Sequence, residues 1–253
     1  MKVLSLNTWG GKAGTQGLLS FFEKYENIDI FCLQEIFDGG EEFRGMPAAR
    51  FALDKFDPKL LERIQEVLPN HVAHFRPHFE DVFGLALFVR KDCAITEEGE
   101  ASIYREKGYY SADNIADQHR ILQYVSLETP ACTIVHVHGL WNGLGKGDSE
   151  HRLMQSDNIL RQVTMRKQPY VLLGDFNLRP ETESVRKLEE AGMRNLITEY
   201  GIASTRTSLY DSLAYEPFAD YAFVSAGIKV NEFKVLPDEV SDHAALYLDF
   251  ELP

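Results

Sequence analysis

The chain has 253 residues, of which 44% are hydrophobic and 26% charged, so its composition is that of a globular protein and excludes a disordered, collagen-like or fibrous chain. Its 26 basic residues against 39 acidic residues give a formal net charge of −13, the opposite of the basic surface of a general nucleic-acid coat protein. That charge is still compatible with a locally basic groove or a bound cation. The length fits one large domain or two small ones.

The cysteines and the N-terminal segment indicate the compartment. Cys32, Cys93 and Cys132 are odd in number and far apart, which argues against a disulfide framework and against a cysteine zinc site. The apolar run Val3–Leu6 is too short for a signal peptide, and no stretch approaches the ~20 apolar residues of a membrane span. We therefore expect a reduced, cytoplasmic protein without a membrane span.

Short apolar runs of strand length recur along the chain, and several are apolar throughout, as in strands buried on both faces. In order they are Val3–Leu6, Ile28–Leu33, Gly84–Val89, Ile121–Leu127, Thr133–Val137, Tyr170–Leu173, Ala222–Val224 and Ala244–Phe250. Apolar residues at helical spacing predict helices over 16–26, 150–165 and 182–191, with Gly192 placed to end the third. No Pro/Gly/Ser-rich linker or repeat divides the sequence. The pattern predicts a single α/β domain over residues 1–253 with layered sheets.

Polar side chains stand where these runs begin or end. Because strand ends converge on one rim in many α/β proteins, we expect these side chains to lie close together. The spacing of Asp175 and Asn177 puts both on the same side of a strand exit, and the adjacent Asp242 and His243 supply a metal-type oxygen and a proton-transfer nitrogen from one place. Taken alone, an Asp or Asn after a strand is ordinarily a turn residue. Together, such oxygen-rich groups suit a hard cation such as Mg²⁺.

The ordered combination of these segments resembles the endonuclease/exonuclease/phosphatase superfamily of metal-dependent phosphoesterases. The resemblance rests on Leu6-Asn7-Thr8-Trp9, Leu33-Gln34-Glu35, His136-Val137-His138, Gly174-Asp175-Phe176-Asn177, Asp220-Tyr221-Ala222-Phe223-Val224-Ser225 and Ser241-Asp242-His243, which span nearly the whole chain. It implies an α/β fold made of a two-sheet β-sandwich flanked by helices, a four-layer, DNase I-like arrangement.

The resemblance also implies a metal site. Glu35 would be the main ligand of Mg²⁺, with Mn²⁺ as the alternative ion. Asn7 would lie beside Glu35, and Asp242 would lie near the cation.

The resemblance further implies a catalytic set that would hydrolyse a phosphodiester or phosphomonoester. Asp175 would position or deprotonate the attacking water, and Asn177 would hold a phosphate oxygen. Asp220 would orient His243, which would contact the scissile phosphate or accept a proton, and His138 would stabilise charge on the phosphoryl oxygens. This division of labour fits phosphoryl transfer, in which negative charge on equatorial oxygens must be neutralised.

The substrate is left open among nucleic acids, sphingomyelin and inositol phosphates, with specificity expected from loops 37–57, 99–118, 139–150 and 205–219. Phe218 stands where the family often has a basic residue, and Ile36-Phe37 stand where abasic-site nucleases usually have Thr-Lys, which argues against classical abasic-site repair. The negative net charge and the aromatic loop residues favour a small, single-stranded or end-modified nucleic-acid-type substrate. The aromatic residues are Phe37, Phe43, Tyr109, Tyr110, Trp141, Tyr210, Tyr215 and Phe218. A sphingomyelinase-type or inositol-phosphate-type enzyme is the alternative, and no protein partner is implied.

A catalytically inactive binding module of the same fold is a further alternative. It is disfavoured because such a module should have lost Glu35, Asp175 or His243, and all three are present. The Trp141 loop is open to two interpretations, a turn or a base-stacking platform.

Other motifs receive structural interpretations. The histidines at 71, 74 and 78 are assigned to a surface segment, because prolines interrupt the helix that would align them. His136 is expected to pack beside His138 without binding metal. The Arg152–Gln155 pair is interpreted as structural, and neither glycine-lysine segment, at 10–13 or at 145–147, fits a P-loop.

Overall fold

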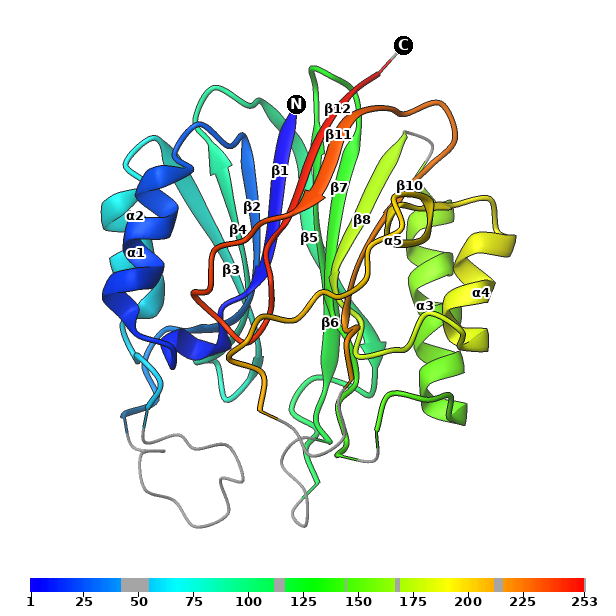
Figure 1. Ribbon diagram of the computed structural model, residues 1–253, viewed down its shortest axis with the longest axis horizontal. Helices are drawn as coiled ribbons and strands as arrows, with labels where there is room; N and C mark the ends of the chain where they lie inside the picture. The colour runs from blue at the N-terminus through cyan, green and yellow to red at the C-terminus, as the bar shows by residue number, and fades with distance from the viewer. Residues whose placement is uncertain (42–54, 112–116, 144, 167–168, 212–215, 253) are drawn as a thin grey trace.

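The computed structural model describes residues 1–41, 55–111, 117–143, 145–166, 169–211 and 216–252. Two six-stranded sheets lie face to face, and helices lie on the outer side of each (Figure 1). The expected α/β sandwich flanked by helices is therefore confirmed.

The two sheets are mixed and follow different strand orders. The first sheet has the order β11 (Lys229–Val235), β12 (Leu246–Glu251), β1 (Lys2–Asn7), β2 (Ile30–Phe37), β4 (Phe83–Arg90), β3 (His71–Phe79). The second has the order β5 (Ile95–Tyr104), β6 (Arg120–Leu127), β7 (Thr133–His138), β8 (Tyr170–Asp175), β10 (Asp220–Val224), β9 (Arg194–Asn195). Within them, β1 pairs with β2 in parallel and β7 pairs with β8 in parallel, so these four strands carry their carboxyl ends toward the same end of the sandwich (Figure 1).

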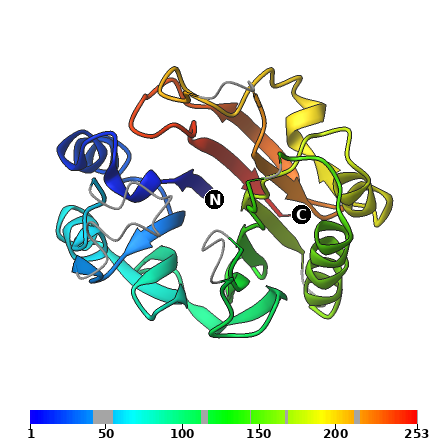
Figure 2. The ribbon, with the colours of Figure 1, turned by 90° about the horizontal axis from the view of Figure 1, so that it is seen from below.

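The helices form the outer layers, which Figure 2 shows from below. Helices α1 (Thr15–Lys24) and α2 (Leu60–Val67) cover the first sheet, and α3 (Glu150–Thr164) and α4 (Glu183–Glu190) cover the second. The single turn η1 (Trp9–Gly11) follows β1, and the short α5 (Leu196–Glu199) follows β9. None of the helices in the described ranges combines the length and apolar character needed to cross a membrane.

Alternation along the central strands divides the core into two layers. Leu4 and Leu6 of β1 pack with Phe22 of α1, whereas Val3 and Ile30 face the apolar layer between the sheets. Burying each such side chain contributes roughly 1.5–3 kcal/mol. Both faces of β1 and β2 are therefore covered, which explains their nearly continuous apolar sequences.

The predicted elements are all present, and the strands that sequence reasoning missed share a position. Each of the eight predicted runs lies within or overlaps a strand, and the three predicted helices correspond to α1, α3 and α4. Gly192, with φ +91°, follows α4 as expected of a residue that ends a helix. The unpredicted strands β3, β5, β9 and β11 are the four sheet edges, where one side faces solvent and the sequence carries many polar residues.

The assignment of the three histidines to a surface segment is wrong. They lie in strand β3, in which His71 and His78 are buried and the imidazole of His74 contacts the Glu98 carboxylate. Pro77 is tolerated because β3 is an edge strand, where proline removes no essential hydrogen bond of the sheet.

Candidate active site

The eight side chains predicted for the site lie together at the end of the sandwich where β1, β2, β7 and β8 finish. His138 and Asp175 are in register on the parallel strands β7 and β8, and Asp220, the first residue of the antiparallel β10, also pairs with Asp175. Loops bring the others to the same place. The full set is Asn7, Glu35, His138, Asp175, Asn177, Asp220, Asp242 and His243.

Glu35 reaches the site through an irregularity in β2. The register between β2 and β4 shifts between Leu33 and Ile36, and Glu35 has a φ of +58°. A bulge re-aims the side chain of its strand, and a left-handed backbone at a non-glycine residue costs on the order of 1–3 kcal/mol. The bulge therefore turns the Glu35 carboxylate toward β7 and β8.

Two glycines let β7 and β8 approach closely beside His138 and Asp175. A Cβ on Gly139 would lie 2.4 Å from the Phe176 carbonyl oxygen, and a Cβ on Gly174, whose φ is +133°, would lie 2.3 Å from the Val137 carbonyl oxygen. The Gly139 amide donates to the Asp175 carbonyl at 2.6 Å. The absence of side chains at these two positions sets the spacing of the imidazole and the carboxylate.

Asn7 links the two carboxylates nearest to it. Its Nδ2 donates to Glu35 Oε1 at 3.1 Å and to Asp175 Oδ2 at 3.0 Å, while its Oδ1 accepts from the Trp9 amide at 3.0 Å. Burial raises the pKa of Glu35, and Asp175 raises it further, whereas Lys12 and the Asn7 hydrogen bond lower it. Asn7 thus orients Glu35 and Asp175, and its Oδ1 keeps a second lone pair besides the one that accepts from the Trp9 amide.

Asp220 and His243 form a buried hydrogen-bonded pair. His243 Nδ1 donates to Asp220 Oδ2 at 2.8 Å and also lies 3.0 Å from Oδ1. Burial raises the pKa of Asp220 and lowers that of His243 to about 3, so the imidazole is neutral. The carboxylate that faces Nδ1 accepts the single ring proton there. His243 Nε2 then directs a lone pair into the site, 3.7 Å from Asp175 Oδ2 and 4.0 Å from Asp242 Oδ1.

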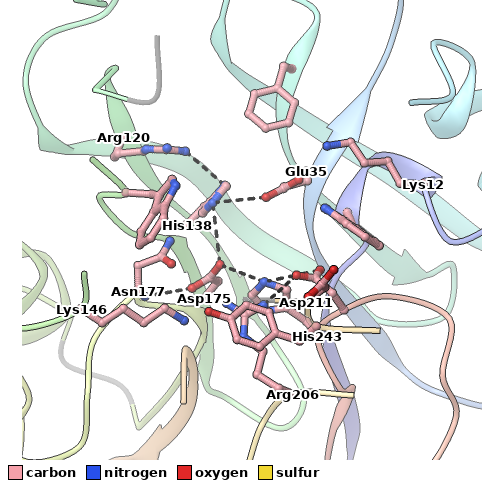
Figure 3. Close-up of a pocket in the computed structure, with 15 residues that line it drawn as sticks. Lys12, Glu35, Arg120, His138, Lys146, Asp175, Asn177, Arg206, Asp211 and His243 are labelled. Atoms are coloured by element: carbon pink, nitrogen blue, oxygen red, sulfur yellow. Dashed lines mark hydrogen bonds and ion pairs between the residues drawn. The ribbon is translucent and has the colours of Figure 1, made fainter. Parts of the chain in front are cut away.

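His138 has a cationic partner instead of a carboxylate. Arg120 Nη1 lies 3.3 Å from His138 Nδ1, and a guanidinium has only donors, so Nδ1 must accept. The neutral ring then carries its proton on Nε2, which lies 3.9 Å from both Glu35 Oε1 and Asp175 Oδ2 (Figure 3). Burial, together with the charge of Arg120, lowers the pKa of His138. The ring is therefore held as a neutral N–H donor.

A pocket of about 420 Å³ opens over these groups and contains cations that the sequence did not reveal. The cations are Lys12, Arg120, Lys146 and Arg206, and the lining carboxylates among the described residues are Glu35, Asp175, Asp211 and Asp242. Figure 3 shows Lys12 on one side of the pocket and Lys146 and Arg206 on another. Lys12 and Lys146 belong to the two segments that fail the P-loop pattern, so no motif pointed to them.

The aromatic residues expected at the rim divide into three groups. Trp141 and Tyr210 line the pocket, together with Trp9. Tyr109 and Tyr110 line a separate cavity of about 160 Å³. Phe37 is buried against Phe56 and Phe83, which corrects its expected place at the rim, whereas Phe218 is half-buried beside the main core. Phe43 and Tyr215, with parts of the expected specificity loops, lie outside the described residues.

The other polar motifs are structural in the described chain. Arg152 donates to the carbonyls of Gly145 and Gly147 at 2.6 Å each, and Gln155 accepts from the Leu140 amide at 2.7 Å. Both residues therefore hold the loop between β7 and α3, as predicted. His136 is fully buried, burial lowers its pKa to about 3, and it does not line the pocket.

The donor set fits a hard divalent cation. Glu35, Asp175, Asp242 and the His243 lone pair all present acceptors to one space, and such a group repels itself without a positive charge. Ligand atoms of Asp175, Asp220 and His243 lie within 4.8 Å of one another, but Asp220 already accepts the His243 proton. The carboxylates on the Glu35 side are therefore the better ligands.

The fold is that of a group of phosphoesterases, which belong to the hydrolase class of enzymes. The chain belongs to the Endonuclease/Exonuclease/phosphatase family, whose model matches residues 4–243, and enzymes of this family generally depend on a divalent metal. No curated protein matches the sequence closely enough to add to this assignment.

Solved structures share the fold at low sequence identity. A mannosyl-6-phosphatase from Bacteroides thetaiotaomicron is 19% identical, with a TM-score of 0.73 over 100% of both chains. The human Nocturnin catalytic domain is 19% identical, with a TM-score of 0.62 over 100% of this chain and 93% of that one. A humanized D. rerio TDP2 is 13% identical, with a TM-score of 0.63 over 99% of this chain and 98% of that one.

Proposed function

We propose that the chain is a single catalytic domain, a Mg²⁺-dependent phosphoesterase that hydrolyses a phosphodiester or phosphomonoester by attack of water. The observation that carries this proposal is the arrangement around Asp175. Its carboxylate lies between a neutral imidazole N–H on His138 and an imidazole lone pair on His243. A proton acceptor, an N–H donor and a cluster of oxygen ligands therefore face one pocket.

Glu35 is the proposed main ligand of the cation, and Asp242, which lines the same pocket, is the proposed residue near the cation. Mg²⁺ or Mn²⁺ bound there would neutralise charge on a phosphoryl oxygen. Asn7 is proposed to belong to the metal site beside Glu35, because its side-chain nitrogen donates to both Glu35 and Asp175 and so orients their carboxylates. Arg206 donates to Asp242 Oδ2 at 3.1 Å, which leaves Oδ1 to face the site.

Asp175 is the proposed group that orients the attacking water and takes up its proton. Its Oδ1 accepts a hydrogen bond from the backbone N–H of Asn177 at 2.9 Å, which fixes the orientation of the carboxylate. Asn177, with a φ of +53°, directs its side chain at the pocket, where it would bind a phosphate oxygen. His138 would donate from Nε2 to a second phosphate oxygen, and Asp220 would keep His243 turned toward the phosphate.

The proposed substrate is a small, single-stranded or end-modified nucleic-acid-type molecule. The support for this is that Trp9, Trp141 and Tyr210 line the pocket, where aromatic rings stack on unpaired bases at roughly 1–3 kcal/mol per base. With a net charge of −13, the chain offers little of the broad basic surface that a duplex requires. Sphingomyelin and inositol phosphates are the alternative substrates.

A substrate panel with Mg²⁺ tests the proposal. It includes abasic duplex DNA, 5′-phosphotyrosyl DNA, single-stranded RNA, sphingomyelin and inositol phosphates, each assayed for product with the wild type and with Asp175→Asn. We expect cleavage of single-stranded or end-modified substrates that depends on both Mg²⁺ and Asp175. Faster cleavage of intact duplex, with affinity that falls steeply between 50 and 200 mM salt, would contradict the substrate class. No product from any substrate would favour an inactive binding module.

A further inference from the structure

Lys146 is a buried cation on the pocket wall that has no counter-charge in contact with it. The residue is 1% exposed, and its Nζ donates to the carbonyl oxygen of Phe218 at 2.9 Å. In the part of the chain that the structure describes, no carboxylate oxygen lies within 4.0 Å of this ammonium. Burying a charge without a partner is costly, and buried charges in proteins are ordinarily paired, so an anionic ligand would supply the partner that Lys146 lacks.

Arg206 adds a second buried cation to the same wall. Its side chain is 5% exposed, and its guanidinium lies 4.2 Å from the centre of the Tyr210 ring, on which Lys146 Nζ also lies at 5.9 Å. Nη1 is bound to Asp242, but Nε is buried and has no hydrogen-bond partner. Lys146 and Arg206 thus lie against the same Tyr210 ring, and each has at least one N–H group without a hydrogen-bond acceptor among the described residues.

These cations belong to the catalytic end of the pocket. Lys146 and Arg206 line the same pocket as Asp175, Asn177 and His243, and Arg206 donates to Asp242. Figure 3 shows Lys146 and Arg206 on the side of Asn177 and His243, away from Lys12. An anion bound by both would therefore lie at the reacting phosphate, not at a remote part of the substrate.

We propose that Lys146 and Arg206 bind the third unesterified oxygen and the second negative charge of a terminal phosphate, so that the enzyme prefers phosphomonoesters. This inference rests on the proposed phosphoesterase function. An internal diester has one negative charge and two free oxygens, for which Asn177, His138 and a cation at Glu35 suffice. A terminal phosphate has a further oxygen and a further charge, which need donors with positive charge.

The test compares two substrates with the same leaving group, p-nitrophenyl phosphate and bis(p-nitrophenyl) phosphate. We expect wild-type kcat/KM to favour the monoester. Lys146→Met should lower kcat/KM for the monoester by roughly 10- to 100-fold, the value of a hydrogen bond to a charged group, and leave the diester nearly unchanged. Lys146→Arg should restore much of the monoester activity. The control is Lys187→Met, since Lys187 lies on α4 and pairs with Asp157.

A binding measurement on the metal-free protein separates the inference from catalysis. In EDTA, inorganic phosphate should raise the melting temperature of the wild type but not that of Lys146→Met. Without phosphate, the variant should melt no lower than the wild type, because it removes an uncompensated buried charge. A merely structural lysine predicts the opposite, a lower melting temperature and equal losses on both substrates.

The outcomes separate the two proposals. Phosphate binding that depends on Lys146, with no hydrolysis of either substrate, supports the anion site and refutes the proposed function. Hydrolysis that favours the diester and ignores Lys146→Met supports the function and overturns the inference. A third arm uses thymidine 5′-(p-nitrophenyl phosphate) with and without a 3′-phosphate. A preference for the 3′-phosphorylated diester that Lys146→Met abolishes would assign Lys146 to a second phosphate and overturn the terminal-phosphate assignment.

Discussion

The hydrogen bond between Asp220 and His243 is expected to make the two residues one catalytic unit. In Asp220→Asn, the amide nitrogen must face either His243 Nδ1–H or the Thr205 hydroxyl, and both groups donate to the native carboxylate. The variant therefore loses a charged acceptor and brings one donor against another. A buried hydrogen bond to a charged group is worth roughly 1.5–3 kcal/mol, which corresponds to roughly 10- to 150-fold in rate.

The assay is a double-mutant cycle. We measure kcat/KM with Mg²⁺ and p-nitrophenyl esters for Asp220→Asn, His243→Ala and the double variant. His243→Ala should cost roughly 10²- to 10⁴-fold, as expected for a lost proton-transfer group. With His243 absent, Asp220 has no imidazole to orient, so the double variant should lose little more than His243→Ala alone. Asp157→Asn is the matched control, since Asp157 on α3 is exposed and pairs with Lys187.

The result that would refute this reasoning is simple additivity. If the loss in the double variant equals the product of the two single losses within about twofold, the residues act independently. Thermal melts of all variants check that the folded fraction is unchanged.

Three further predictions concern the cation, the strand contact and the buried lysine. Glu35→Gln should lower turnover by orders of magnitude with the fold intact, and full activity in excess EDTA would contradict the metal role. Gly139→Ala should destabilise the fold by roughly 2 kcal/mol or more in urea unfolding, because its Cβ would meet the Phe176 carbonyl at 2.4 Å, whereas Gly147→Ala, with no neighbour within 4 Å, should be nearly neutral. Burial and Arg206 lower the pKa of Lys146 from 10.5 to about 8, so the unfolded chain binds more protons between those values. Wild-type stability should therefore rise relative to Lys146→Met by up to about 3 kcal/mol as pH increases from 8 to 10.5, and parallel curves would refute the shift.

The positions of the site residues could be predicted because they follow from strand geometry. A buried strand that ends at Asn7, His138 or Asp175 places a polar group at the sheet end, and the resemblance of the ordered segments to a known family supplied the remaining residues. The β2 bulge at Glu35 left no separate sign in the sequence, since a register shift depends on the partner strand. The edge strands β3, β5 and β11 were missed because their solvent-facing residues interrupt the apolar pattern.

The cations of the pocket could not be predicted, because their effect depends on tertiary burial and not on residue type. Arg120, Lys146 and Arg206 come from separate segments and match no motif. Their side chains are buried by residues distant in the sequence, which a count of charged residues does not show. The net charge of −13 counts every charged residue of the chain and does not say where each of them lies. Four cationic and four carboxylate side chains line the pocket among the described residues, and the Asp220 carboxylate lies directly behind His243, so a divalent cation there would leave an excess of about one positive charge. That local excess favours an anionic ligand, so an acidic protein is able to bind a phosphate there.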